Sequence, residues 1–545
     1  MAKMRKFGCF VVLMLAQLSM LLLPSTGSTQ LNDGVRITIY DLVSQGKAVA
    51  FTTPQVEWLG AYSANTRVND INNDTIDDFL IGGDAMRIFF GHTGQWSNHS
   101  VFDADATIIS GLSPGLSNQI SNPVGAGDLN NDGFPDVLLA SFWGPVNRDP
   151  LAKAFLFFGG NSTAWTIDTP VSDADAIFIA EAEGNFLGHG MDGVGDVNAD
   201  GYDDFVITSE FNDQAHDGAG KAYLVLGRAT TAWNISTNIG EAASASFLGT
   251  EVDGWFGMNA AGVGDVNNDG FDDFLLGGAT HSTERLRENY LVFGRPTPRW
   301  QKDVPKTDVV NVTFRFKTED QLGGAAGRFM SGVGDVNGDS LDDFIVGAYK
   351  DDEGGTDTGQ SFLFLGRSQD HWPPSPALVD AADYANASFI GETVNERAGY
   401  SVSGAGDINA DGYDDILIGA SNAQSEVEGK AYVIFGRATN QWTMDQSLSK
   451  ADLIVAGGQD IGVGNRFATD VSGIGDINDD GYADFSISAS WVEYRRGMIF
   501  VVFGGSAWAP TVPTETTTTQ SSPAWTLVIM MLSLAALVFR RGMNP

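Results

Sequence analysis

The chain has 545 residues, and its 69 acidic residues outnumber its 31 basic ones, giving a formal net charge of -38. A charge of this sign and size argues against nucleic acid or an anionic membrane surface as a partner. The only cysteine is Cys9, so no disulfide can form within the chain. The 66 glycines are typical of a β protein that is dense in turns.

The N-terminus is the first predicted element. Residues 1–28 begin with the basic MAKMRK, continue through a long apolar run and close on small residues in PSTGS. This three-part layout predicts a secretory signal peptide. The alternative is an N-terminal anchor that is retained.

An acidic motif then recurs seven times and is clearest in GVGDVNNDGFDDFLLGGA, residues 262–279. Successive copies start 58 to 72 residues apart, and their first aspartates are Asp70, Asp128, Asp196, Asp265, Asp335, Asp407 and Asp476. Repeated units that cannot bury their faces alone form one continuous array. The repeat therefore predicts a single large domain.

Each copy contains short apolar segments that we interpret as four strands. In the copy around Phe247 these are ASFLG, the stretch ending in AAGVG, DDFLLGGA and NYLVFGR. A tryptophan follows the last segment in every copy, at Trp96, Trp165, Trp233, Trp300, Trp372, Trp442 and Trp508. Short strands separated by Gly and Asp turns predict an all-β, seven-bladed β-propeller over residues 31–509. A linear β-solenoid is the alternative, but its coils are much shorter than these units.

The two ends of the propeller show how the ring would close. The last copy ends at residues 499–508 without a further strand, whereas VRITIYDL (35–42) and KAVAFTTP (47–54) precede the first acidic motif. We expect N-terminal residues to complete the seventh blade, so that neither end leaves an open sheet edge.

The acidic motif has the spacing D-x-N-x-D-x-x-x-D, which brings oxygen atoms from alternate residues of a tight loop toward one point. Ca²⁺ takes six to eight oxygen ligands in flexible geometry, so we predict about seven calcium sites; Mg²⁺ retains more water and fits less well. Asx-rich turns without metal are the alternative. The predicted ligands are the side chains at positions one, three, five and nine and the carbonyl at position seven: Asp70, Asn72, Asp74, Ile76, Asp78; Asp128, Asn130, Asp132, Phe134, Asp136; Asp196, Asn198, Asp200, Tyr202, Asp204; Asp265, Asn267, Asp269, Phe271, Asp273; Asp335, Asn337, Asp339, Leu341, Asp343; Asp407, Asn409, Asp411, Tyr413, Asp415; Asp476, Asn478, Asp480, Tyr482, Asp484.

Differences among the copies refine this motif. Position nine is acidic in all seven copies, but position eight is Pro135 in the second copy and Ala483 in the seventh. We therefore take position nine as the ligand and expect the side chain at position eight to face solvent. Position six, expected to need φ > 0, is Thr75 in the first copy and Ser340 in the fifth instead of glycine, which predicts weaker sites there.

The C-terminus predicts a tether and an anchor. Residues 510–523 are rich in Thr and Pro and cannot form a core. Residues 524–545 contain sixteen apolar residues, about 24 Å as a helix, followed by two arginines. We predict a transmembrane or sorting segment, with the bulk of the chain extracellular. A retained helix and a helix that is processed during surface anchoring remain alternatives.

The stretch WFGMNAAGVGDVNNDGFDDFLLGGA, residues 255–279, resembles an FG-GAP repeat, the unit of the integrin α-subunit β-propeller. The resemblance covers about residues 31–509, and seven is also the blade number of that propeller. It implies four-stranded blades with calcium loops on the lower face, between the first two strands of a blade. Integrin leg domains do not follow in this sequence, so pairing with a β subunit is not implied.

Other motifs carry less weight. GLSPG (111–115) matches a nucleophile elbow but has no flanking strand and helix, and GHGMDG (188–193) precedes an acidic loop instead of a helix. A surface or packing role suits His189. Sequons at Asn98, Asn161, Asn234, Asn311 and Asn386 are candidate glycan sites, whereas the sequon at Asn73 lies inside an acidic loop.

These features predict a calcium-binding, surface-anchored adhesion or ligand-binding module that is not an enzyme. We expect an unidentified protein or glycan to bind the face opposite the calcium loops, through the variable segments 141–154, 209–222, 280–290 and 349–361. Arg285 and Arg287 in the third segment would suit an anionic partner. Fold alone leaves two alternatives, a secreted propeller enzyme acting on polysaccharide and a structural coat protein.

Overall fold

The computed structural model describes residues 35–52, 65–83, 85–110, 121–141, 151–279, 287–316, 329–421, 428–458, 466–490 and 497–508. The chain divides into one compact unit that ends at Ala507 and a second that begins at Trp508. The predicted signal peptide (1–28), tether (510–523) and C-terminal segment (524–545) lie outside the described residues. Within the ranges given above, no helix is long and apolar enough to cross a membrane.

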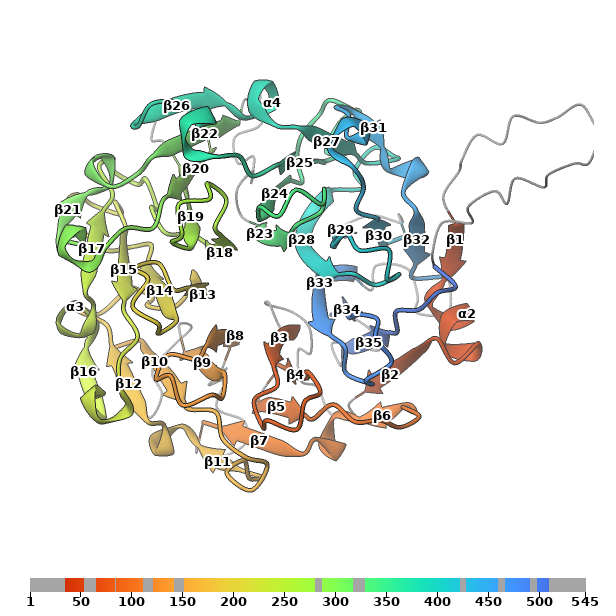
Figure 1. Cartoon of the computed structure of the whole chain (residues 1–545), viewed down its shortest axis with the longest axis horizontal. Helices are drawn as coiled ribbons and strands as arrows, with labels where there is room; N and C mark the ends of the chain where they lie inside the picture. The colour runs from red at the N-terminus through yellow and green to blue at the C-terminus, as the bar shows by residue number, and fades with distance from the viewer. Residues whose placement is uncertain are drawn as a thin grey trace, which may run out of the picture. The chain divides into compact units, whose positions relative to one another are not determined.

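Seven five-stranded sheets form the first unit, and we number them as blades 1 to 7 (Figure 1). The innermost strand of each blade contacts the innermost strand of the next, and β33 contacts β3, so the cycle is closed. In order of blades 1 to 7, the innermost strands are β3 (Asn65–Asn69), β8 (Ser121–Gly127), β13 (Met191–Gly195), β18 (Ala260–Gly264), β23 (Phe329–Gly334), β28 (Ala398–Gly406) and β33 (Phe467–Gly475). These contacts confirm the predicted seven-bladed all-β propeller.

The next two strands of each blade continue the sheet in antiparallel pairs. The second strands are β4 (Asp78–Ile81), β9 (Asp136–Ser141), β14 (Asp204–Ser209), β19 (Asp273–Ala279), β24 (Asp343–Ala348), β29 (Asp415–Ala420) and β34 (Asp484–Ala489). The third strands are β5 (Ala85–Phe89), β10 (Lys153–Phe157), β15 (Lys221–Val225), β20 (Arg287–Val292), β25 (Gln360–Phe364), β30 (Lys430–Ile434) and β35 (Met498–Val502). Both faces of β14 and β29 are buried, which explains why such segments are apolar runs without alternation.

Two further strands complete each blade at the rim. The fourth strands are β7 (Ala106–Ile109), β12 (Ala176–Ile179), β17 (Ala245–Leu248), β22 (Val312–Phe316), β27 (Ala387–Ile390), β32 (Leu453–Ala456) and β2 (Ala48–Thr52). The fifth strands are β11 (Thr169–Pro170), β16 (Ser236–Asn238), β21 (Val304–Pro305), β26 (Ala377–Asp380), β31 (Gln446–Ser447), β1 (Val35–Thr38) and β6 (His99–Ser100). The described helices of the α class are short: α2 (Ile39–Ser44), α3 (Ile239–Ala242) and α4 (Ala381–Tyr384).

The N-terminus completes the seventh blade, as the sequence predicts. β2 pairs antiparallel with β35, from Ala48 opposite Val502 to Thr52 opposite Met498. In Figure 1 the red and orange β2 and β6 lie beside the blue β33 to β35. β1 also pairs parallel with β32 of blade 6. Both N-terminal segments are therefore built into the ring, and residues far apart in sequence close it.

The structure corrects two details of the predicted blade. The ASFL segment, β17, is the fourth strand of blade 3, so the sequence repeat and the blade in space are offset by one strand. Each blade also has five strands, whereas the resemblance implied four. The fifth is a short parallel strand that comes from the segment before the fourth strand of the next blade, as where β11 pairs with β7.

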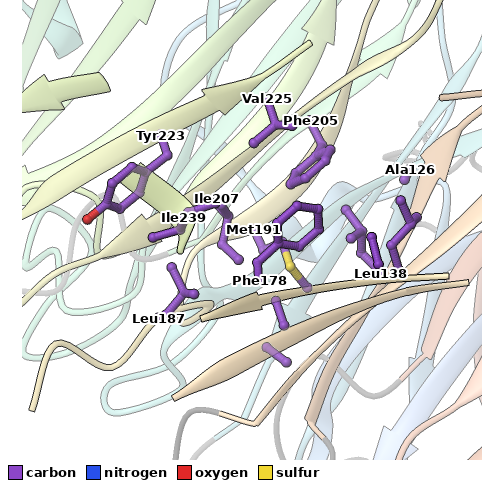
Figure 2. Close-up of a cluster of buried hydrophobic side chains, with 14 of the residues drawn as sticks. Ala126, Leu138, Phe178, Leu187, Met191, Phe205, Ile207, Tyr223, Val225 and Ile239 are labelled. Carbon is purple, nitrogen blue, oxygen red and sulfur yellow. The ribbon is translucent and has the colours of Figure 1, made fainter. Parts of the chain in front are cut away.

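The core lies between adjacent blades. Figure 2 shows this seam for blades 2 and 3, where Leu138 and Phe178 face Met191, Phe205 and Ile207. Nearer the rim, an arginine after the third strand stacks on the recurring tryptophan in four blades. The stacked pairs are Arg228–Trp233 at 4.4 Å, Arg295–Trp300 at 4.7 Å, Arg367–Trp372 at 4.9 Å and Arg437–Trp442 at 5.1 Å. This cation–π packing links the arginine and the tryptophan in the four copies that carry both.

Candidate functional site

The seven acidic loops all lie between the first and second strands of a blade, and the structure describes every one of them. Position nine is the first residue of each second strand; in blade 4 this residue is Asp273. Each innermost strand has a shift in register just before its loop, as between Gly262 and Gly264. The bulge turns the chain into the loop, so the predicted ligands of one copy gather at the lower end of one blade.

Hydrogen bonds to the backbone hold each loop closed. In blade 4, Asp265 Oδ1 accepts from the Asp269 N–H at 3.1 Å, and Asp265 Oδ2 accepts from the Gly270 N–H at 2.9 Å. Asp269 Oδ1 accepts from the Phe271 N–H at 3.2 Å. The same three bonds form in the other six copies. Positions one and five thus shape the loop as well as supply carboxylate oxygens.

Two positions of every loop have a left-handed backbone. Position four has positive φ throughout, for example 56° at Ala199 and 55° at Ala410. Position six is glycine in five copies, with φ of 86° at Gly270. Thr75 and Ser340 take the same conformation at 81° and 67°, respectively. The predicted need for φ > 0 at position six is confirmed, and the two exceptions carry backbone strain.

The carboxylate at position nine is fully buried in all seven copies. In blade 2, Asp136 accepts from the N–H of Leu129 at 2.9 Å and from that of Gly159 at 2.9 Å. Burial, together with the smaller effect of the charges of Asp132 and Asp128, raises the pKa of the Asp136 carboxyl to about 8, despite these two bonds. The same causes raise the pKa values of the other six position-nine aspartates. A cation would offset this penalty.

The prediction for position eight is wrong. The aspartates at this position do not point into solvent; each accepts a hydrogen bond from the backbone N–H at position one of the preceding blade. The bonds run from Asp128 to Asp203 at 2.8 Å, Asp196 to Asp272 at 2.8 Å, Asp265 to Asp342 at 3.0 Å, Asp335 to Asp414 at 3.0 Å and Asp476 to Asp77 at 3.1 Å. We call this bond the position-eight clip. Because its partners are 75 to 79 residues apart at four seams and 399 residues apart at the fifth, the motif alone could not reveal it.

Position three provides the test of whether the loops fit a cation. In the described residues, no group of three or more His, Cys, Asp or Glu side chains is arranged as a metal cluster. However, the amide oxygens of Asn130, Asn267, Asn409 and Asn478 are buried and accept no hydrogen bond. A buried oxygen without a donor costs about 1–3 kcal/mol, and it is a ligand that Ca²⁺ accepts. The set of carboxylate, amide and carbonyl oxygens therefore fits calcium.

In two loops the amide oxygen has a donor from the next blade. Thr297 Oγ1 lies 3.2 Å from Asn198 Oδ1, and Thr439 Oγ1 lies 3.2 Å from Asn337 Oδ1. These hydroxyls compete for the oxygen that a cation would use, so the loops are not equivalent.

The opposite, upper face carries a cluster that the sequence analysis missed. Phe186, Phe211 and Trp255 are half-buried and come from three connections at the upper ends of blades 2 to 4. Ring centroids are 5.3 Å apart for Phe186 and Phe211 and 6.2 Å apart for Phe211 and Trp255. Phe186 and Trp255 have φ of 49° and 45°. The sequence signal that could have revealed two of these rings is an aromatic residue directly before a Leu-Gly pair (187–188) and a Phe-Gly pair (256–257).

Charged and polar side chains lie close in sequence to two of these aromatic residues, and another contacts the third ring. His189 Nδ1 lies 2.6 Å from Glu210 Oε2, and the Arg287 guanidinium lies 5.7 Å from the centre of the Trp255 ring. Of the predicted upper-face segments, residues 142–150 and 280–286, including Arg285, lie outside the described residues. GLSPG (111–115) also lies outside them, and GHGMDG leads into strand β13, not a helix.

The asparagines of the sequons differ in their hydrogen bonds and in their exposure. Asn311 Oδ1 accepts from the Phe293 N–H at 2.9 Å, and Asn386 Oδ1 accepts from the Leu365 N–H at 3.0 Å. These two asparagines cap the ends of third strands, whereas Asn161 and Asn234 are exposed. Glycan attachment at any of the sites stays a prediction.

Comparisons with known proteins agree with this geometry. The FG-GAP repeat family matches residues 398–434, which contain the first three strands and the acidic loop of blade 6. Mouse integrin alpha-IIb is 29% identical over 201 residues, covering 37% of this chain and 18% of the integrin. Integrin alpha-5 of Xenopus laevis is 30% identical over 184 residues, covering 34% of this chain and 16% of the integrin. The match thus spans less than a fifth of either relative.

Proposed function

We propose that this chain, whose residues 398–434 match the FG-GAP repeat family and whose propeller is similar to that of integrin α subunits, is a calcium-stabilised adhesion module displayed outside the cell. The signal peptide (1–28) would direct export, and residues 524–545 would anchor the propeller through the Thr/Pro-rich tether. These assignments rest on the sequence pattern. The relatives are integrin subunits, which supports a binding role over an enzymatic one.

The acidic loops would hold about seven Ca²⁺ ions through positions one, three, five, seven and nine. Two observations support this assignment. The position-nine carboxylates are buried beside other carboxylates, and four position-three amide oxygens have no donor. Calcium supplies positive charge that balances the buried carboxylates when it is bound. The loops then act as structural clips, since each joins the two inner strands of its blade.

The aromatic cluster on the upper face is the observation that carries the proposed binding role. Strands and acidic loops repeat around the ring. Phe186, Phe211 and Trp255 form a three-ring cluster across blades 2 to 4, whereas blades 5 and 6 have a ring pair, Tyr349 and Tyr400, with centroids 5.0 Å apart. Two of the three are held half-buried by a left-handed backbone, a conformation that bulky side chains adopt only when the surrounding structure enforces it. Aromatic groups that remain accessible are favoured anchors in binding sites.

The test combines surface binding with matched variants of the full chain. We expect a Trp255→Asn, Phe211→Ala double variant to lose at least tenfold in affinity for the ligand found with glycan arrays and surface extracts. Asparagine tolerates the left-handed backbone, so Trp255→Asn removes the ring without adding strain. Phe102→Ala is the matched control, because Phe102 is also an accessible aromatic (49% exposed) but lies on the rim.

The outcomes are distinct. Loss of binding in the double variant, with Phe102→Ala unchanged and both variants folded, supports recognition through the upper face. Equal binding by all three proteins would remove the aromatic cluster from the site. Loss of binding on chelation alone would show only that the scaffold needs its ions.

A further inference from the structure

Every seam between blades has the same main-chain bond at the lower face. The third residue after the end of the third strand of one blade donates its N–H to the position-two carbonyl of the preceding blade. The pairs are His92 to Ile477, Gly160 to Ile71, Arg228 to Leu129, Arg295 to Val197, Arg367 to Val266, Arg437 to Val336 and Gly505 to Ile408, with distances from 2.8 to 3.1 Å. Each acidic loop is thus already in contact with the next blade before any side chain is considered.

The position-eight clip is added to this bond at five of the seven seams. It is missing where blade 2 meets blade 1, because position eight is Pro135, and where blade 7 meets blade 6, because position eight is Ala483. The clipped seams therefore join blades 2 to 6 into one arc and blades 7 and 1 into another. Blade 7 is the blade that both ends of the propeller sequence build.

The glycine before position one leaves the space that the carboxylate of the position-eight clip occupies. Gly127, Gly195, Gly264, Gly334 and Gly475 have φ from 66° to 79°, and a Cβ on any of them would overlap the carboxylate of the clipping aspartate. The sixth glycine, Gly406, faces Ala483. The first copy has Asn69 instead, and that is the copy whose neighbour carries Pro135. Glycine at this position thus accompanies every clip, and it is replaced only where no carboxylate needs the space.

We propose that the position-eight aspartates are positioning residues that couple each acidic loop to the next blade and divide the ring into a five-blade arc and a two-blade arc. They are not ligands of the proposed ions. Each one fixes the backbone N–H of a position-one aspartate, whose side chain is a predicted ligand, so the loop of one blade is set by the adjacent blade. This inference rests on the proposed calcium loops only for its effect on ion binding, since the clip itself joins protein to protein.

Hydrogen exchange of the full chain, measured by mass spectrometry at residue resolution, tests the clip directly. In Asp342→Ala the Asp265 amide loses its acceptor and should exchange about tenfold faster, because a bond to a charged acceptor contributes roughly that factor. Asp342→Asn keeps an acceptor oxygen and should restore part of the protection. Asp370→Ala, which removes an exposed carboxylate elsewhere, should leave the Asp265 amide unchanged.

Substitutions can also introduce a position-eight clip at the two seams that lack one. The Ala483 N–H donates to the Asp407 carbonyl at 3.1 Å, as the Asp203 N–H does to the Asp128 carbonyl at 3.2 Å. Ala483→Asp should therefore reach the Asp407 N–H and slow its exchange about tenfold. At the other seam Pro135→Asp alone should have no such effect on the Asp70 amide, because Asn69 fills the space. Pro135→Asp combined with Asn69→Gly should protect that amide.

Measuring these variants with chelator and with saturating Ca²⁺ separates the two proposals. With chelator, exchange at Asp265 and Asp407 reports the clip alone, and unchanged rates in both Asp342→Ala and Ala483→Asp would overturn it. In a calcium titration, Asp342→Ala should raise the Ca²⁺ concentration needed to protect the amides of residues 265–273 from exchange. The Ca²⁺ concentration needed to protect residues 407–415 should stay unchanged. Altered exchange at Asp265 without any calcium protection would keep the clip and refute the calcium loops.

Discussion

At the scale of single residues, the left-handed positions of the acidic loops show how the repeat tolerates substitutions. Glycine reaches φ near +85° without steric cost, whereas a β-branched side chain is strained there. Thr75 adopts φ of 81° and donates its N–H to Asp70 Oδ2 at 2.6 Å, the bond that position six makes in every copy. The strain is local, so it should be measurable in single variants.

We expect Thr75→Gly to stabilise the protein by about 1 kcal/mol, since the relief of left-handed strain exceeds the added freedom of glycine in the unfolded chain. Ser340→Gly should act in the same direction. The reverse change, Gly270→Thr, should destabilise by a similar amount. Thermal unfolding of the three variants measures these shifts, and a loss of stability in Thr75→Gly would contradict the strain argument.

The buried position-nine carboxylates predict an unusual pH dependence. Their folded pKa values, about 8 at Asp136 and Asp204, exceed the unfolded value of about 3.9, so the folded state binds protons more tightly. The stability that protonation provides is fully present below about pH 4 and is lost as the pH rises through about 8. Calcium-free protein should therefore unfold at a lower temperature at pH 8 than at pH 5.

Two comparisons isolate this effect in thermal unfolding experiments. Asp204→Asn cannot titrate at position nine and should flatten the slope of stability against pH. Saturating Ca²⁺ should reduce the slope in the native sequence, because the bound ion replaces the proton. A calcium-free protein that becomes more stable between pH 5 and pH 8 would show that burial does not control these carboxyls.

At the scale of the strands, the sequence predicts the inner part of a blade better than its rim. Second and third strands such as β29 (DILIGA) and β30 (KAYVI) are mostly apolar segments of six and five residues near Gly and Asp turns, so they are recognisable alone. Fifth strands such as β11 have two residues and no pattern of their own. Their pairing depends on the next blade, and this tertiary dependence also caused the offset between sequence repeat and blade.

The strand that closes the ring gives a prediction at this scale. Phe51 of β2 is fully buried, and its ring centroid lies 5.6 Å from that of Phe79 and 4.9 Å from that of Phe89, both in blade 1. Phe51→Ala should cost about 3–5 kcal/mol in unfolding free energy through the cavity it leaves. Phe102→Ala should change it by less than about 1 kcal/mol, because that ring is 49% exposed. Denaturant unfolding measures both; similar losses would mean that β2 does not secure the closure.

At the scale of the whole propeller, features within one sequence copy are predictable from the motif, whereas contacts between blades are not. The residues of one acidic loop are contiguous, so the motif alone predicted the loop and its left-handed position six; that its side chains bind calcium stays a prediction. The position-eight clips and the aromatic cluster join residues from different blades. No period within one copy encodes such pairs, and only the closed ring brings Asp342 to Asp265 or Phe211 to Trp255.

Calcium dependence is the prediction that tests the propeller as a unit. The full chain, dialysed against millimolar Ca²⁺, should hold close to seven ions by elemental analysis, with the loops of Thr75 and Ser340 the weakest. Saturation at 100 times Kd adds about 2.7 kcal/mol per site when the ion has little affinity for the unfolded chain. Chelation should therefore lower the melting temperature strongly, and excess Ca²⁺ should restore it. Because the seven loops close the inner strands of seven blades, the loss of protection on chelation should be spread around the ring. It should appear in the hydrogen exchange of all second strands.

Two or fewer ions per chain, or a melting temperature that chelation leaves unchanged, would contradict this prediction. Either result would show that the loops are ordinary turns and that the buried carboxylates are held by protonation alone.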